Sequence, residues 1–152
     1  NSLKGAESSS EEKCAILIGE KKTSTKSKHQ NFWQITHIWQ CRNIWGEEDS
    51  RLNENTEAKN ERQKQMHLSK ESRFEIDPKA QIASKKWARN NNLEVLCFAH
   101  SHPTDENKPS KIDLLWHQAP GLIVISDKNG NLKAWWIKNK DNFHQVKIEI
   151  FS

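Results

Sequence analysis

Short apolar segments separated by polar turns recur along the chain and predict a β-rich fold. Residues 14–18 form an apolar run that ends at Gly19, and residues 93–99 form a second run of seven residues. Continuous runs of this length are typical of buried strands. Further strands are predicted at 32–41, 74–76, 122–126, 132–137 and 146–150. Alternation within the first of these predicts one shared face for Trp33, Ile35, His37, Trp39 and Cys41.

Helix start signals predict where the helices lie. One helix is predicted to begin at Asp77-Pro78, a capping residue followed by a first-turn proline, and to end near Arg89. Residues 110–116 follow a proline and open with Ser-x-x-Asp, which is a capping-box pattern. The composition of residues 3–12 also favours the end of a helix. The whole pattern predicts an α/β fold with a mixed sheet and two or three helices.

The length of 152 residues corresponds to about one domain, so we predict a single domain over residues 1–152. Hydrophobic residues make up 34% of the chain and charged residues 29%, which is polar but sufficient for a core. Residues 46–72 consist almost entirely of Glu, Asn, Lys, Arg, Gln and Ser. We interpret this segment as a mobile insertion loop.

Cysteine content and charge narrow the class of protein. The three cysteines are odd in number and widely spaced, which argues against a disulfide framework and favours a reducing, cytoplasmic compartment. The net charge is +4, but Lys and Arg are interleaved with Asp and Glu, so we expect no nucleic-acid binding. The apolar runs are far shorter than the roughly 20 residues that a membrane span needs, so we expect no membrane association.

The segment HSHPTDENKPSKID contains a candidate metal site. Two residues apart in an extended segment, His100 and His102 project to the same side. Asp113 follows Ser110 by three residues and lies with it on the first turn of the predicted helix. Two imidazoles and one carboxylate make a three-ligand set, which leaves a position for water and is typical of catalytic zinc. A base for that water must come from elsewhere in the fold.

This segment resembles the JAMM motif of the MPN/JAB-domain metallopeptidases, in which the second His of H-x-H-P is followed by seven residues and then by S-x-x-D. The strand EKCAILIG, which begins at Glu12, is similar to the strand that carries the family's glutamate. The segments RFEIDP at 73–78 and LIVIS at 122–126 resemble bacterial members. The resemblance covers nearly the whole chain. It departs at Ala15, where the family usually has Gly, and at the long insertion 46–72.

The resemblance implies an MPN/JAB (cytidine-deaminase-like) fold, with a mixed sheet flanked by two or three helices. It implies that His100, His102 and Asp113 bind Zn²⁺. Glu12 would deprotonate the water and pass the proton to the leaving amine, and Ser110 would donate a hydrogen bond to the oxyanion. The implied activity is hydrolysis of an amide or isopeptide bond at the C-terminal tail of a ubiquitin-like or sulfur-carrier protein, which would be the partner of this chain.

Each residue also has a simpler interpretation. Taken alone, the His-x-His pair would be solvent-facing, Ser110 an ordinary helix cap and Glu12 a surface carboxylate; their joint spacing favours the metal site. His117 is interpreted as an exposed or partly packed helix residue outside the site. Two other functions compete. One is a non-catalytic MPN scaffold, although such relatives commonly lack ligands. The other is a RadC-like DNA-associated protein, whose Ser-Gly pair after the proline is replaced here by Thr104-Asp105.

Overall fold

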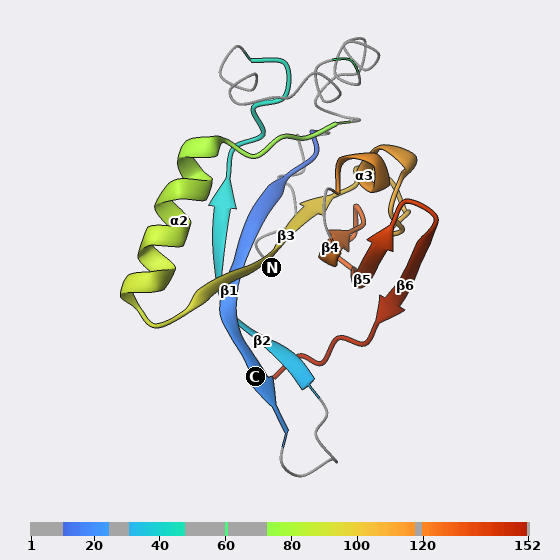
Figure 1. Ribbon diagram of the computed structural model, residues 1–152. Helices are drawn as coiled ribbons and strands as arrows, with labels where there is room; N and C mark the ends of the chain where they lie inside the picture. The colour runs from blue at the N-terminus through green and yellow to red at the C-terminus, as the bar shows by residue number, and fades with distance from the viewer. Residues whose placement is uncertain (1–10, 25–30, 48–59, 61–72, 118–119, 152) are drawn as a thin grey trace.

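A six-stranded mixed sheet forms the centre of the protein (Figure 1). The computed structural model describes residues 11–24, 31–47, 60, 73–117 and 120–151. The strands are β1 (Cys14–Thr23), β2 (Asn31–Cys41), β3 (Glu94–Ser101), β4 (Gly121–Ser126), β5 (Leu132–Asn139) and β6 (Asn142–Val146), in the order β2-β1-β3-β4-β5-β6. Only β3 and β4 pair in parallel. The predicted mixed α/β architecture is confirmed.

Two helices accompany this sheet in the described part of the chain, α2 (Pro78–Asn90) and α3 (Lys111–Trp116). The α2 helix begins as predicted, because the Asp77 side chain accepts a hydrogen bond from the Lys79 backbone N–H (2.9 Å). It lies along β1 and β2, while α3 lies at the end of the sheet where β3 and β4 finish (Figure 1). Neither helix is long and apolar enough to cross a membrane.

Among the described residues, three apolar clusters form the core on the two faces of the sheet. Ile16 and Ile18 of β1 are fully buried and pack on the α2 side, together with Ala88 of that helix. Leu17 lies on the opposite face with Val124 of β4, as the alternation of a strand requires. A third cluster joins β4 and β5 to α3, and consists of Ile123, Ile125, Trp135 and Ile137 with Leu114 and Phe143 packed against them.

The predicted single face of β2 is wrong, because the strand contains an irregularity. Ile18 pairs with His37 and Gly19 pairs with Ile35, so Thr36 has no partner residue in β1. An extra residue of this kind inverts the alternation beyond it. Trp33 therefore packs in the cluster of Leu17, and Trp39 packs in the cluster of Ile16 on the other face.

Three other boundaries differ from the sequence predictions. The last strand is Asn142–Val146 and not 146–150, because a tight turn after β5 starts the hairpin earlier; Asp141 N–H donates to the Asn139 side chain there (2.9 Å). The predicted strand 74–76 is reduced to a single bridge between Asn43 and Ile76. Residues 11–12 are not helical, and residues 3–10 lie outside the described residues, as does most of the predicted insertion 46–72.

Candidate metal centre

The two histidines lie where β3 ends, between β1 and β4. His100 belongs to β3, and the Ser101 backbone N–H donates to the Lys13 carbonyl (2.8 Å). The Ser101 hydroxyl accepts from the Lys13 N–H (2.8 Å), so that side chain points away from the imidazoles, as predicted. The backbone N–H of His102 donates to the Ser126 carbonyl of β4 (2.7 Å). Neighbouring strands on both sides thus fix the His-x-His segment.

Asp113 reaches the same place from the first turn of α3. Its carboxylate Oδ2 accepts from the Ser110 backbone N–H (2.9 Å), and the Ser110 Oγ accepts from the Asp113 N–H (3.1 Å). This is the predicted capping box, and it holds the carboxylate in one orientation. Ser110 itself is exposed, and its hydroxyl proton is not used in the capping box. One side chain can therefore cap the helix and still donate a hydrogen bond to a substrate.

The three side chains meet at one point, with one imidazole facing each oxygen of the carboxylate. His100 Nε2 and His102 Nε2 are 3.1 Å apart, and each lies 3.2 Å from an oxygen of the Asp113 carboxylate. Tetrahedral zinc with bonds of 2.0–2.1 Å requires ligand atoms about 3.3 Å apart. The donor set and its spacing therefore fit zinc, and all three side chains are largely buried. The structure brings together the three residues that the sequence predicted as ligands.

The electrostatics of the three side chains favour metal binding. Burial would raise the pKa of Asp113, but the charge of His100 and the hydrogen bonds from both imidazoles and from Ser110 outweigh it and hold the pKa well below its usual range. His102 Nδ1 lies 3.1 Å from the Glu106 carbonyl, which can only accept, so Nδ1 carries the proton. The Nε2 of His102, which donates to Asp113 in the metal-free site, is then the atom that would lose its proton and give a lone pair to a metal.

Glu12 lies just before β1 and is buried, with 6% of its surface exposed. Cys14 pairs with His100 across the sheet, and this register carries Glu12 to the end where the histidines lie. Burial and the negative charge of Asp113 raise the pKa of Glu12 to about 8, against the opposing effects of His102 and Arg73. A surface carboxylate would show no such shift. The geometry instead suits a group that exchanges protons near neutral pH.

A buried asparagine that the sequence analysis did not identify connects Glu12 to the segment before α2. The Asn43 amide donates to the carbonyls of Glu12 (3.1 Å) and Arg73 (3.0 Å). Its oxygen accepts from the backbone N–H groups of Trp45 (3.1 Å) and Glu75 (3.0 Å). Asn43 is followed by two large apolar residues, which signals burial, but its partners 30 and 31 residues away cannot be found from the sequence.

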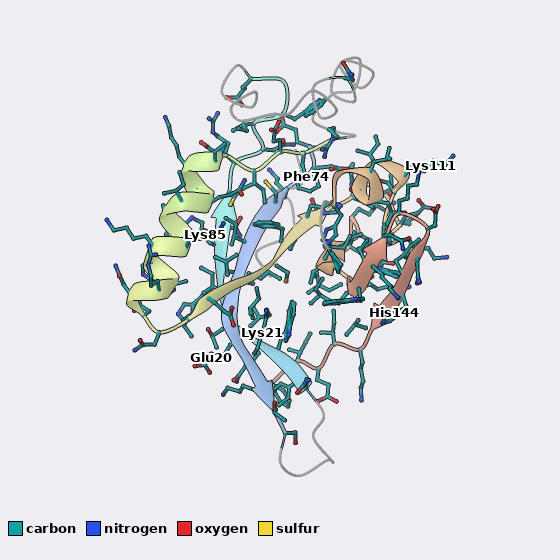
Figure 2. The ribbon with its side chains drawn as sticks, viewed as in Figure 1. Glu20, Lys21, Phe74, Lys85, Lys111 and His144 are labelled. Atoms are coloured by element: carbon teal, nitrogen blue, oxygen red, sulfur yellow. The ribbon has the colours of Figure 1, made fainter. Side chains whose placement is uncertain are left out.

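Two neighbours of the site were noted in the sequence only as part of the segment RFEIDP. Phe74 stacks on the His100 ring with 4.3 Å between ring centroids, and Figure 2 shows it at the same end of the sheet as α3, where Lys111 is labelled. The Arg73 guanidinium is buried and lies over the rings of Trp45 (5.1 Å) and Phe74 (5.5 Å). This layered arrangement forms one wall of the site.

Residues excluded from the site lie as expected. Cys14 and Cys97 are buried in the apolar clusters, with exposed fractions of 1% and 5%. His117 is partly buried at the end of α3, where its backbone N–H donates to the Asp113 carbonyl (3.2 Å). These positions agree with the interpretation of the cysteines as small apolar residues and of His117 as a partly packed histidine.

The chain is similar in sequence to one protein family and to one curated protein, and similar in fold to a solved structure. The family described as prokaryotic homologues of the JAB domain matches residues 3–138. A desampylase of Pyrococcus furiosus is 33% identical over 78 residues, which cover 51% of this chain and 56% of that protein. The chain thus spans about half the length of this curated relative. A solution structure of a protein from Desulfitobacterium hafniense is similar in fold, with a TM-score of 0.62 and 19% identity over 92% of this chain and 78% of that one.

Proposed function

This chain belongs to the family of prokaryotic JAB-domain homologues, and from that premise we propose that it is a zinc-dependent metallopeptidase. The observation that carries the proposal is the group of donor atoms from His100, His102 and Asp113, in which the two Nε2 atoms are 3.1 Å apart and each lies 3.2 Å from one of the two carboxylate oxygens. A purely structural zinc site normally has four protein ligands. Three ligands next to a buried carboxylate favour hydrolysis.

The residues have separate tasks in this proposal. When bound, zinc lowers the pKa of water to about 7 and polarises a carbonyl group. The carboxylate of Glu12 accepts the proton of the attacking water and then delivers it to the leaving amine. The exposed Ser110 hydroxyl donates a hydrogen bond to the oxyanion of the tetrahedral intermediate. The capping box keeps this hydroxyl next to the Asp113 carboxylate.

The raised pKa of Glu12 makes its protonation state depend on whether a metal ion is bound. With a pKa of about 8, the metal-free site holds Glu12 largely protonated at neutral pH. A positive charge at the three proposed ligands favours the ionised carboxylate. Glu12 therefore becomes a competent base when the three proposed ligands hold a cation, which restricts hydrolysis to the loaded protein.

We extend the proposal to the bond that is cleaved. Similarity to an archaeal desampylase supports an isopeptidase that acts on a ubiquitin-like modifier. The proposed substrate is an amide or isopeptide bond at the C-terminal tail of a ubiquitin-like or sulfur-carrier protein. A non-catalytic scaffold does not require the three metal-binding side chains. A DNA-associated function would be expected to show a basic stripe, but Lys and Arg are interleaved with Asp and Glu along the sequence.

Metal content tests the proposal first. We expect one zinc per chain in the wild type by elemental analysis and a loss of zinc in His102→Ala and Asp113→Ala. His144→Ala is the matched control, because His144 is exposed on β6. Wild-type protein that stays metal-free in excess zinc would refute the proposal that the chain is a zinc enzyme.

Activity then separates the enzyme from a metal-binding scaffold. The substrate is a ubiquitin-like protein joined through its C-terminal carboxyl to a lysine. Glu12→Gln should keep its zinc and lose hydrolysis, and Ser110→Ala should lose about 100- to 1,000-fold in kcat. Full hydrolysis by Glu12→Gln would contradict the assigned base.

A further inference from the structure

The loop between the second histidine and α3 is fixed by three hydrogen bonds to its backbone carbonyls. Thr104 O accepts from the Lys128 N–H (2.8 Å). Glu106 O accepts from His102 Nδ1 (3.1 Å), and Asn107 O accepts from the indole N–H of Trp135 (2.8 Å). The carbonyl of Glu106 therefore binds a proposed metal ligand, and the carbonyl of the next residue binds a tryptophan of β5. The loop bridges two of the three proposed ligands, so its conformation bears on their separation.

Trp135 is rigidly held itself. Its side chain is 8% exposed and lies in the cluster of Ile123 and Ile125, with Phe143 edge-on at 5.9 Å. The same cluster includes Leu114, the residue after Asp113 in α3. An indole N–H can only donate, and when buried it usually has a partner. The Trp135 side chain thus connects the loop between His102 and α3 to the apolar cluster against which α3 packs.

We propose that Trp135 is a positioning residue for the metal centre, which fixes the Asn107 peptide so that the neighbouring Glu106 carbonyl orients the His102 ring. This inference rests on the proposed zinc function and adds a residue to it. Partners that orient a metal-bound histidine typically contribute 10- to 100-fold to metal affinity. Trp135 acts one hydrogen bond further out, so we expect an effect of about 10-fold.

The chain offers a matched pair of variants. Trp135→Phe removes the indole N–H and keeps an aromatic ring in the cluster. Trp136→Phe makes the same change at the next residue, which points to the opposite face of β5 and meets Trp33 edge-on at 5.8 Å. Zinc affinity is measured by chelator competition. We expect affinity to fall about 10-fold in Trp135→Phe and to stay near wild type in Trp136→Phe.

Cobalt absorption separates positioning from a general loss of stability. Co²⁺ is substituted for zinc in both variants, and the ligand-field spectrum reports the geometry of the coordinating atoms. The spectrum should change in Trp135→Phe and not in Trp136→Phe. Equal zinc affinities and equal cobalt spectra in the two variants would overturn the inference while leaving the zinc proposal intact. A wild type that binds neither metal would overturn both.

A measurement on the wild type keeps the inference testable if Trp135→Phe does not fold. Exchange of the Trp135 indole N–H with solvent is followed by nitrogen-edited NMR, with its resonance assigned by through-space contacts to the Phe143 ring, which lies edge-on to Trp135. Zinc binding should slow this exchange, because the hydrogen bond to Asn107 belongs to the loop that joins two of the proposed ligands. Exchange that is unchanged by zinc would count against the role of Trp135.

Discussion

Replacing Glu12 by Gln should make the metal-free protein more stable at alkaline pH. Glu12 is 6% exposed, and its pKa rises from 4.5 to about 8 in the folded state, first through burial and then through the charge of Asp113. Between these two values the folded protein binds more protons than the unfolded chain. The free energy of unfolding therefore falls as the pH rises from about 4.5 towards about 8. Gln resembles the protonated form and removes this dependence.

The shift sets the expected magnitude. Each pKa unit corresponds to about 1.4 kcal/mol, so the full shift corresponds to at most about 5 kcal/mol. Between about pH 5 and pH 8, wild type should lose roughly 3 kcal/mol of stability relative to Glu12→Gln. Burial opposes the charge of His102, but Asp113 and the Glu12 charge raise its pKa, so this pKa should be lower in Glu12→Gln than in wild type.

Urea unfolding of chelator-treated protein at the two pH values measures this difference. Glu11→Gln is the control, because it removes the neighbouring carboxylate from an exposed position. A stability difference between Glu12→Gln and wild type that is the same at both pH values would show that the Glu12 carboxyl is not held in a buried site. Adding zinc should restore the stability of the wild type at alkaline pH. A ligand that binds only the folded state raises the free energy of unfolding.

Three further predictions concern stability and use the same unfolding assay. Asn43→Ala leaves four backbone groups without their side-chain partner and should cost about 2–4 kcal/mol, whereas Asn131→Ala, at an exposed turn position with one side-chain bond to Asp127, should cost less than about 1 kcal/mol. Equal costs would contradict the assigned network. Gly19→Ala would place a Cβ 1.8 Å from the Gln34 carbonyl and should cost at least about 1–3 kcal/mol, so a neutral result would refute the close approach of the strands. Ile16→Ala, at a fully buried position, should cost about 2–5 kcal/mol.

The place of each proposed ligand within its own segment could be predicted because that geometry is local, and the resemblance to the JAMM motif joined the segments into one site. His100 and His102 lie on one side of an extended segment by the period of a strand, and Asp113 is placed by the capping box that Ser110 begins. Both rules act over two or three residues and need no knowledge of the tertiary structure. The start of α2 at Asp77 follows from the same kind of local signal.

Contacts between distant residues were the part that the sequence could not supply. Asn43 meets Glu12 across 31 residues, and Trp135 meets Asn107 across 28. Both contacts depend on which strands are neighbours, and the hydrophobic pattern does not encode strand order. The prediction of a single face for β2 failed for a related reason. The alternation of apolar residues continues past Thr36, but the pairing with β1 is irregular there.

Strand register is what joins the local signals into a site. Glu12 and His100 lie 88 residues apart in the chain, and they come to the same end of the sheet because Cys14 pairs with His100 and Ala15 with Ala99. A slip of one residue in β3 would turn His100 to the opposite face and separate it from Asp113. Register is fixed away from the site, by irregularities in the pairing of β1 at Leu17/Ile18 and at Ile18/Gly19 and by the close approach of Gly19 to Gln34. The pairing along β1 therefore determines which residues of β3 meet Glu12 at the end of the sheet.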